Sequence, residues 1–285
     1  MKILVLGANG MLGTEVVAEL EGHGQIIQRD MHDCDITDEE CVASEVREGK
    51  PDIVINCAAF TNVDGCETNK DTAFSVNAEG VKNVARACKN TGCSLYHIST
   101  DFVFDGTKRS PYSESDNPNP VSVYAHSKYM AEQYVKETAE KYVIIRTAWL
   151  FGKKGKNFVS TIRSLAMEKR RLTVVHDQIG SPTYAIDLAK AINALIQKKA
   201  QGIYHVTNSG MCSWYEFAKE IVYRCGADNE VVPVTSDEYP RPAKRPAYSV
   251  LDCAKFENYT GMRLRRWQDA LDAYLEEIRE TEERG

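Results

Sequence analysis

The chain has 285 residues, of which 43% are hydrophobic and 27% charged, and its formal net charge is −6. This composition is that of a globular protein with room for one large or two modest domains. The acidic balance, without a long basic run, argues against nucleic acid as the main partner. No apolar run is long enough to span a membrane, and the N-terminus lacks the features of a signal peptide, so we expect a cytoplasmic protein.

The chain opens with an apolar segment, a glycine-rich turn and an amphipathic segment. Residues 2–6 are the predicted strand, and Gly7, Gly10 and Gly13 mark the turn that follows. Gly7 permits the tight turn, Gly10 the close approach of a ligand, and Gly13 close packing of the helix on the strand. Such a turn presents backbone N–H groups and the positive end of a helix to a pyrophosphate. It therefore predicts a dinucleotide site, the alternative being an ordinary tight turn between a strand and a helix.

Strands and helices alternate through the first half of the chain. The predicted strands are residues 2–6, 25–29, 52–56, 94–98 and 143–146, and the predicted helices are residues 12–21, 38–49, 72–90 and 125–140. Thr37, followed by three acidic residues, is the predicted N-cap of the second helix. Apolar strands that alternate with helices predict a parallel sheet covered on both faces. Right-handed crossovers make this a Rossmann-type, doubly wound α/β fold.

The alternation becomes less regular after about residue 148. Predicted strands at 172–175, 202–206 and 230–234 are separated by predicted helices near 186–198, 213–224 and 266–283. The segment 239–246 has three prolines and three basic residues, which predicts a loop. We therefore expect a dinucleotide-binding Rossmann domain over residues 1–150 and a smaller α/β substrate-binding lobe over residues 151–285. Some chain exchange between the two is expected, with the ligand in the cleft between them.

Nine cysteines are scattered along the chain, and none of them forms a C-x-x-C motif. In a reducing compartment such cysteines are free thiols, several of them buried. The ligand spacing of a structural zinc site is absent, so we expect none.

A tyrosine and a lysine lie one helical turn apart in the motif Tyr124-x-x-x-Lys128, which puts them on one face of a helix. An ammonium about 4 Å from a phenolate attracts it by about 4 kcal/mol at an effective dielectric constant of about 20. This attraction would bring the phenol pKa from about 10 towards neutral, where the tyrosine can serve as an acid. Tyr215 and Lys219 match the same motif, but they lie in the smaller lobe, where we expect packing and solvation.

Small and polar residues follow two of the predicted strands. Ser99 and Thr100 follow the fourth strand, at the edge of the sheet where doubly wound proteins bind ligands. A hydroxyl there can hold a substrate carbonyl or share a proton with Tyr124, or it can simply cap a turn. The small side chains of residues 57–59, after the third strand, would let a nicotinamide or its ribose approach closely.

Together, these motifs occur in the order and spacing of the extended short-chain dehydrogenases. Within them the chain resembles the dTDP-4-dehydrorhamnose reductase family from residue 2 to about residue 267. Besides the glycine turn and Tyr124-x-x-x-Lys128, the segments that carry the resemblance are residues 56–59, 60–64, 99–106, 146–149, 177–183, 245–246 and 249–252. The resemblance covers nearly the whole chain and is far more specific than any one motif.

The resemblance implies reduction of the C4 carbonyl of a dTDP-linked 4-keto-6-deoxy sugar by the nicotinamide hydride. Tyr124 would donate the proton, Lys128 would lower the phenol pKa and hold the nicotinamide ribose, and Thr100 would hydrogen-bond the carbonyl oxygen. The implied cofactor-binding residues are Gly7, Asn9, Gly10, Met11, Leu12, Gly13, Arg29, Asp35, Ile36, Cys57, Ala58, Ala59, Thr61, Tyr124 and Lys128. The implied substrate-binding residues are Val63, Thr100, Asp101, Phe102, Trp149 and Arg245.

The sequence leaves the choice of cofactor open. An acid at the end of the second strand suits NAD and an arginine suits NADP, and the chain has both, Arg29 and Asp30. We expect NADPH, with NADH possible. The basic loop that holds Arg241, Lys244 and Arg245 could meet the substrate diphosphate or be a solvated loop.

Some relatives in this family bind magnesium through acidic residues at a dimer contact. Glu15 matches one of these residues, but residues 184–187 lack the full acidic set. We therefore expect Glu15 to be a solvated helix residue and the protein, a monomer or homodimer, to need no metal.

Two other functions stay open. A different sugar-nucleotide reductase or epimerase would share the hydride-transfer motifs and differ in its sugar pocket. A relative of this family is a non-catalytic, NADP-binding regulatory subunit of methionine adenosyltransferase. The presence of Thr100, Tyr124 and Lys128 favours an enzyme.

Overall fold

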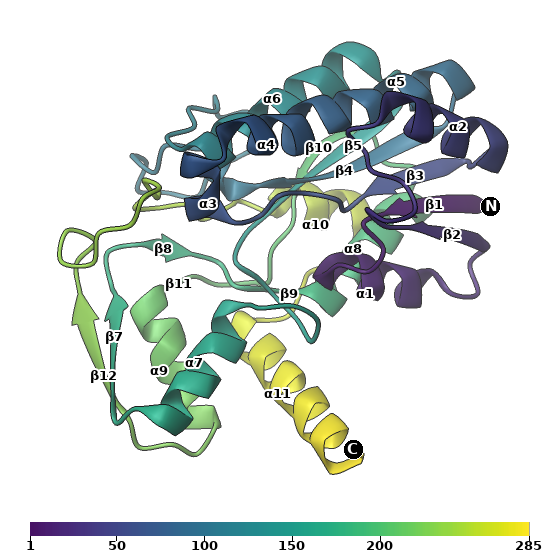
Figure 1. Cartoon of the computed structure of the whole chain (residues 1–285). Coiled ribbons are helices and arrows are strands. Elements are labelled where there is room, and N and C mark those ends of the chain that lie inside the picture. The colour runs from purple at the N-terminus through teal and green to yellow at the C-terminus, as the bar shows by residue number, and fades with distance from the viewer. Residues whose placement is uncertain (285) are drawn as a thin grey trace.

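The computed structural model describes residues 1–284; Gly285, the last residue of the predicted smaller lobe, lies outside them. Within these residues the central sheet has six parallel strands (Figure 1). In spatial order they are β10 (Gly202–His205), β5 (Tyr142–Thr147), β4 (Ser94–Thr100), β3 (Ile53–Asn56), β1 (Lys2–Leu6) and β2 (Gln25–Arg29). All four residues of β3 are buried, as is typical of a strand covered on both faces.

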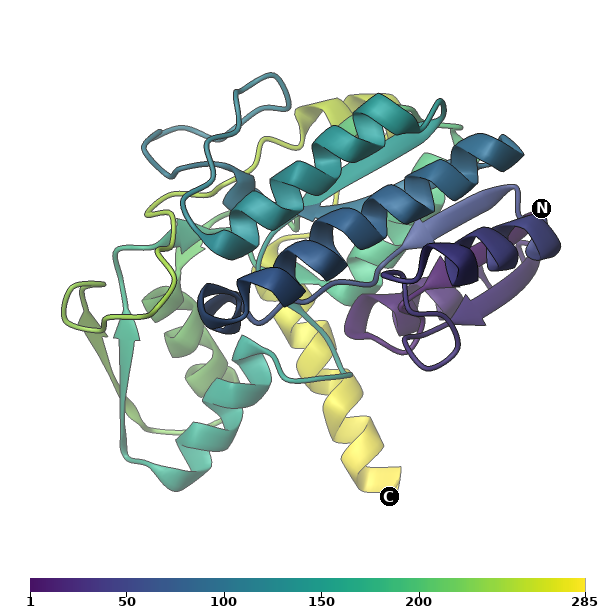
Figure 2. The same cartoon turned by 45° about the horizontal axis from the view of Figure 1, so that its top comes forward.

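Helices cover both faces of the sheet (Figures 1 and 2). One face carries α1 (Met11–Leu20), α8 (Ala185–Gln197) and α10 (Ala254–Thr260), and the other carries α2 (Glu39–Gly49), α5 (Val81–Thr91) and α6 (Val123–Thr138). A buried apolar cluster fills the space between the sheet and each helical layer. This arrangement confirms the predicted doubly wound α/β fold.

The strand order changes direction at β1. The chain continues from β1 to β2 on one side and returns to β3 on the other, so the turns after β1 and β3 are neighbours. Gly7 shows how close they are: its φ is +73°, and an added Cβ would lie 2.7 Å from the Ala58 backbone nitrogen. A side chain there would be strained and would clash. Doubly wound proteins bind ligands at this kind of switch point.

A smaller lobe lies beyond the carboxyl ends of the strands. Its elements are β6 (Leu150–Phe151), α7 (Phe158–Glu168), β7 (Arg171–Val175), β8 (Ile179–Gly180), β9 (Thr183–Tyr184), β11 (Cys212–Ser213), α9 (Trp214–Arg224), β12 (Glu230–Val234) and α11 (Trp267–Arg284). Its core is aromatic, and the ring centroid of Phe151 lies within 5.8 Å of the ring centroids of Phe217 and Tyr274. Two segments after residue 150 return to the sheet layer, since β10 pairs with β5 and α8 packs on α1.

The segment after β3 differs from its prediction. It consists of α3 (Val63–Thr68), α4 (Lys70–Phe74) and a π-helical turn, η1 (Ser75–Gly80), which runs into α5. The wider turn carries the buried side chain of Asn77, which accepts from the Phe60 nitrogen at 2.7 Å and donates to the Phe60 oxygen at 3.0 Å. The helix predicted near 72–90 is therefore present, but a tertiary contact widens one of its turns.

The prediction of Thr37 as the N-cap of α2 is wrong. Asp38, not Thr37, is the N-cap, and its carboxylate accepts from the nitrogens of Glu40 and Cys41 at 3.0 and 3.1 Å. Thr37 is engaged elsewhere, because its nitrogen and its hydroxyl both donate to Asp35 Oδ1 at 2.9 Å.

Two predictions from composition bear on the described residues. Among residues 1–284, no helix combines the length and the apolar character needed to cross a bilayer. All nine cysteines lie in this range and are free thiols, as predicted.

Candidate active site

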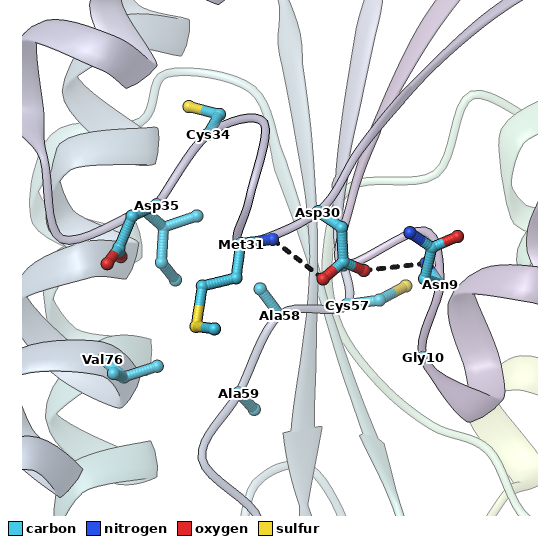
Figure 3. Close-up of a pocket in the computed structure, with 12 residues that line it drawn as sticks. Asn9, Gly10, Asp30, Met31, Cys34, Asp35, Cys57, Ala58, Ala59 and Val76 are labelled. Atoms are coloured by element: carbon cyan, nitrogen blue, oxygen red, sulfur yellow. Dashed lines mark hydrogen bonds between the residues drawn. The ribbon is translucent and has the colours of Figure 1, made fainter. Parts of the chain in front are cut away.

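A cavity of about 370 Å³ lies at the turn after β1 (Figure 3). It is lined by Gly7, Asn9, Gly10, Asp30, Met31, Cys34, Asp35, Ile36, Cys57, Ala58, Ala59 and Val76. The Asp30 carboxylate connects the segments that follow β1 and β2. It accepts from the backbone nitrogens of Asn9 at 2.9 Å and Met31 at 2.8 Å. Gly10 is the N-cap of α1 and has no side chain to cap the first turn. The N–H groups of that turn are therefore free for an anion.

Most of the predicted cofactor residues of the glycine turn and of the strand ends line this cavity. The structure adds Asp30, Met31, Cys34 and Val76. Asp30 could be foreseen as the acid at the end of the second strand, whereas the other three carry no local signal. Gly13 does not line the cavity. It lets α1 pack closely on the turn after β1, because an added Cβ would come 2.8 Å from the Ala8 Cα.

Arg29 does not line the cavity. Its Nε lies 2.8 Å from Glu45 Oε2, and its Nη1 donates to the Gln28 oxygen at 2.9 Å. The neighbouring carboxylate on α2 thus holds the guanidinium that we expected to bind the cofactor.

A second cavity, of about 420 Å³, continues from the first and shares Gly10, Cys57 and Ala59 with it. Its other lining residues are Met11, Leu12, Thr61, Ile98, Ser99, Thr100, Asp101, Tyr124, Lys128, Thr147, Ala148, Trp149, Leu150 and Lys156. The structure thus brings the three predicted catalytic residues together at the carboxyl end of β4.

Local structure explains how these three residues meet. Ser122 caps α6, its hydroxyl accepting from the Ala125 nitrogen at 3.3 Å, so that Tyr124 and Lys128 lie one turn apart on the first two turns of the helix. Thr100 is the last residue of β4, next to α6. The second match to the motif, Tyr215-x-x-x-Lys219, lies on α9, outside the cavity.

Lys128 is buried and is held by β4. Its Nζ donates to the Ile98 oxygen at 2.6 Å and lies 3.5 Å from His97 Nε2. Burial lowers the pKa of Lys128 to about 8, although the charge of Glu132 favours the ammonium. Burial also lowers the pKa of His97, so this imidazole is neutral.

The Tyr124 phenol is neutral as well. Burial raises its pKa above the ordinary value; the Thr100 hydroxyl opposes this shift, and the charge of an ionised Asp101 adds to it. Lys128 is not among the groups that shift this pKa, and its ammonium is bonded to the Ile98 oxygen. Tyr124 therefore keeps its proton near neutral pH, as a proton donor must.

A third cavity, of about 450 Å³, opens into the smaller lobe and shares Lys156 with the second. Its other lining residues are Phe158, Thr161, Ile162, Leu165, Thr173, Val174, Val175, Gln178, Trp214, Tyr239, Arg241 and Arg245. Trp149 connects the two cavities by stacking on Trp214, with ring centroids 3.5 Å apart and an interplanar angle of 5°. Trp149 has a φ of 47°, a left-handed backbone that is costly outside glycine and that gathers at functional sites.

Asp64 anchors the basic loop beside the third cavity. It forms ion pairs with Arg241 and, at 3.0 Å, with Arg245 Nη1, and it accepts from the Ala243 nitrogen at 3.2 Å. Burial of Asp64 favours the neutral acid, but hydrogen bonds from Arg245 and Arg241 bring its pKa down to about 2. Two guanidinium groups share one carboxylate, so positive charge remains for an anion at the cavity mouth. Lys244 lies outside the cavity lining.

Two predicted substrate residues lie outside the cavity linings. Val63 is the first residue of α3. The Phe102 ring stands edge-on to Tyr124, with centroids 6.1 Å apart and an interplanar angle of 82°, so it contacts the phenol from outside the cavity.

Glu15 is not the solvated residue that we expected. It is half-buried on α1, burial and the charge of Glu277 raise its pKa, and Lys153 opposes that shift. No group of three His, Cys, Asp or Glu side chains among residues 1–284 is placed to hold a metal ion.

Known proteins are similar to this chain in architecture and in sequence. The family model described as RmlD substrate binding domain matches residues 1–280. The spore coat polysaccharide biosynthesis protein SpsK of Bacillus subtilis is 43% identical over 277 residues, which are 97% of this chain and 97% of that protein.

Two solved structures are similar to this chain in fold and in sequence. A dTDP-4-dehydrorhamnose reductase from Clostridium acetobutylicum has a TM-score of 0.95 at 45% identity, over 98% of this chain and 100% of that chain. The dTDP-4-dehydrorhamnose reductase of Bacillus anthracis, in complex with NADP, has a TM-score of 0.94 at 42% identity, over 97% of this chain and 99% of that chain. The chain therefore belongs to the RmlD substrate binding domain family, as an oxidoreductase alongside the dTDP-4-dehydrorhamnose reductases.

Proposed function

We propose that this protein reduces the C4 keto group of dTDP-4-dehydro-L-rhamnose to give dTDP-L-rhamnose. NADPH is the preferred cofactor, NADH is also accepted, and Tyr124 is the proton donor. The observation that carries this proposal is the run of adjoining cavities. The first has the character of a dinucleotide cradle, the second holds Tyr124, Lys128 and Thr100, and the third has aromatic and cationic walls suited to a nucleotide diphosphate.

The residues of the second cavity fit proton delivery to a carbonyl oxygen. The bound nicotinamide supplies a hydride to C4. Tyr124 Oη transfers its proton to the keto oxygen as negative charge develops there, and the Thr100 hydroxyl stabilises that charge. The Lys128 ammonium offsets the phenolate that forms and has donors left for the nicotinamide ribose.

The third cavity suits the nucleotide part of the substrate. A thymine base can stack against aromatic side chains there, and Trp214 and Tyr239 both line the cavity. The guanidinium of Arg245 is half-buried at the same cavity, and its fork of donors matches the oxygens of a diphosphate. Nine free thiols and a nucleotide-sugar substrate are consistent with work in the cytoplasm.

The direct test follows NADPH absorbance while a preceding epimerase generates dTDP-4-keto-6-deoxy-L-mannose in situ. We expect absorbance loss that depends on both the sugar and this protein, with dTDP-L-rhamnose as the product on chromatography. The same 4-keto sugar on UDP or GDP is the matched control for the nucleotide. Turnover only with another nucleotide sugar would favour the other reductase or epimerase. Tight NADPH binding without turnover of any of them would favour the regulatory subunit.

Cofactor choice can be tested at Arg29. Arg29→Ala should weaken binding of NADPH more than that of NADH, because a guanidinium pairs with the 2′-phosphate, which NADH lacks. Glu45→Gln frees the same guanidinium from its ion pair, so it should shift the preference further towards NADPH. Titration calorimetry of both variants measures the two affinities. Equal losses of NADPH and NADH in Arg29→Ala would mean that Arg29 does not bind the phosphate.

A further inference from the structure

A buried carboxyl group lies next to the predicted catalytic threonine. Asp101 is 2% exposed and lines the same cavity as Tyr124 and Thr100. Its Oδ1 accepts from Thr100 Oγ1 at 3.0 Å, and its Oδ2 has no hydrogen bond of ordinary geometry among residues 1–284, although the Ser249 hydroxyl and the backbone N–H groups of Asp101 and Phe102 favour the carboxylate. A buried carboxylate oxygen without a partner is costly, whereas the oxygen of a neutral carboxylic acid is much less so. The site therefore favours a protonated Asp101.

The protonation of Asp101 decides where the Thr100 hydroxyl points. The Thr100 oxygen already accepts from the Phe102 nitrogen at 3.2 Å, and a hydroxyl has one hydrogen and two lone pairs. If Asp101 is ionised, the hydroxyl hydrogen must go to the carboxylate. If Asp101 is neutral, its O–H donates to Thr100 and fills the second lone pair. The Thr100 hydrogen is then free to turn towards Tyr124.

We propose that Asp101 works as a neutral carboxylic acid that positions the Thr100 hydroxyl towards the Tyr124 phenol and the substrate keto oxygen. It is a positioning residue, since it acts through Thr100. This inference rests on the proposed reduction and adds to it a residue that controls the direction of one hydrogen bond. Ionisation of Asp101 would switch the site off by reversing that bond.

The charges around Asp101 agree with this role. Burial raises the pKa of Asp101 to about 7, although the Ser249 and Thr100 hydroxyls favour the carboxylate. Tyr124 of α6 faces Asp101, and a negative Asp101 raises the pKa of the phenol and so opposes phenolate formation. Cys66 of α3 is a neutral thiol in this pH range, because burial raises its pKa to about 11. Lys128 keeps its ammonium on the Ile98 oxygen. A neutral Asp101 therefore helps Tyr124 to release its proton.

The expected pH dependence follows from the direction of this shift. The active form is the neutral acid, which is lost as pH rises through the pKa of about 7. Between about pH 6 and about pH 7.5 the neutral fraction of such a group falls about fourfold, and kcat should fall with it. Lys128 titrates higher, at a pKa of about 8, so most of it keeps its ammonium over this window.

Asp101→Asn is the decisive variant, because its amide N–H₂ donates to Thr100 at every pH. We expect kcat at about pH 6 to fall by less than about fivefold, and the decline towards pH 7.5 to disappear. Asp101→Leu, which has no donor, should lower kcat more than about tenfold at both pH values while NADPH still binds. Asp105→Asn, four residues away at a half-buried carboxylate that accepts from Thr107, Tyr112 and Asn119, should keep the wild-type profile.

Infrared difference spectra give a second readout that needs no turnover. Wild type should lose a protonated-carboxyl band between pH 6 and 7.5, and Asp101→Asn should lack this band. A wild-type kcat that stays flat over this range, or an Asp101→Asn profile parallel to wild type, would overturn the inference and leave the proposed reduction standing. No turnover of the dTDP sugar by wild type would overturn the proposed function, and the positioning role with it.

Discussion

Replacing Tyr124 by phenylalanine should lower kcat by about 10²–10⁴-fold, the usual contribution of a positioned general acid. The substitution removes one oxygen and leaves the ring that Phe102 contacts edge-on, so the fold should persist. The glycine cradle is separate from the phenol oxygen, and Tyr124 does not line the first cavity. NADPH should therefore bind with nearly unchanged affinity while turnover is lost.

Stopped-flow absorbance for turnover and calorimetry for NADPH binding measure the two quantities independently. Tyr215→Phe is the matched control, because it removes the same atom from the other Tyr-x-x-x-Lys motif, on α9. It should have wild-type kcat. If Tyr124→Phe kept kcat within a few-fold of wild type, another group would be the acid, and Asp101 would be the next candidate.

The sequence predicts well those elements that are decided by local pattern. The short apolar strands and the amphipathic helices between them lie within two residues of their predicted ends at β1, β2 and α6. Tyr124 and Lys128 could be placed on one face because helical spacing alone determines it. The small residues after β3 could be placed beside the ligand because doubly wound proteins bind ligands at the carboxyl ends of their strands.

Tertiary contacts decide what the sequence does not predict. The π-turn at Ser75–Gly80 exists because a buried Asn77 must reach the backbone of Phe60, and no local pattern encodes that partner. The strand Gly202–His205 pairs with β5 of the central sheet, while its sequence is compatible with either lobe. Glu45 on α2 forms an ion pair with the Arg29 guanidinium, which does not line the first cavity. Pairings of this kind depend on positions far apart in the chain.

The cost of burying a charged group is the second reason why the sequence does not predict the whole site. From spacing alone, the ammonium of Lys128 should lower the phenol pKa, but the estimate omits the cost of burying a phenolate. In the folded site burial is the largest influence on the phenol, and the pKa of Tyr124 rises. The same effect makes Asp101 a candidate neutral acid, although nothing in the string of residues around it distinguishes it from an exposed aspartate.

Glu132→Gln should lower the free energy of unfolding by about 3–5 kcal/mol, because it leaves a buried guanidinium without its counter-charge. Glu132 on α6 is fully buried and accepts from Arg146 Nε at 2.8 Å and from Arg146 Nη2 at 2.6 Å. Arg146 on β5 is 1% exposed. Its other neighbour, His205 at 3.3 Å, is a neutral imidazole, because burial and then the Arg146 charge lower its pKa to about 3.

Urea unfolding of the variant measures this loss, and the exposed pair of Glu39 and Arg86 provides the control. Those two side chains are 61% and 46% exposed, so Glu39→Gln should cost less than about 1 kcal/mol. The double variant Glu132→Leu with Arg146→Met removes both charges and should be more stable than either single variant. A loss below about 1 kcal/mol in Glu132→Gln would mean that water or rearrangement solvates the arginine.

The same pair links stability to the active site. Ser99 Oγ donates to Glu132 Oε1 at 2.6 Å, so one carboxylate ties β4, β5 and α6 together directly below Thr100 and Lys128. Glu132 also favours the charged form of Lys128. Glu132→Gln should therefore lower the pKa of Lys128 and move the second fall of kcat, which follows that of Asp101 and belongs to Lys128, to lower pH, whereas Glu39→Gln should leave it in place. A stability loss without that shift would show that the pair supports the fold alone.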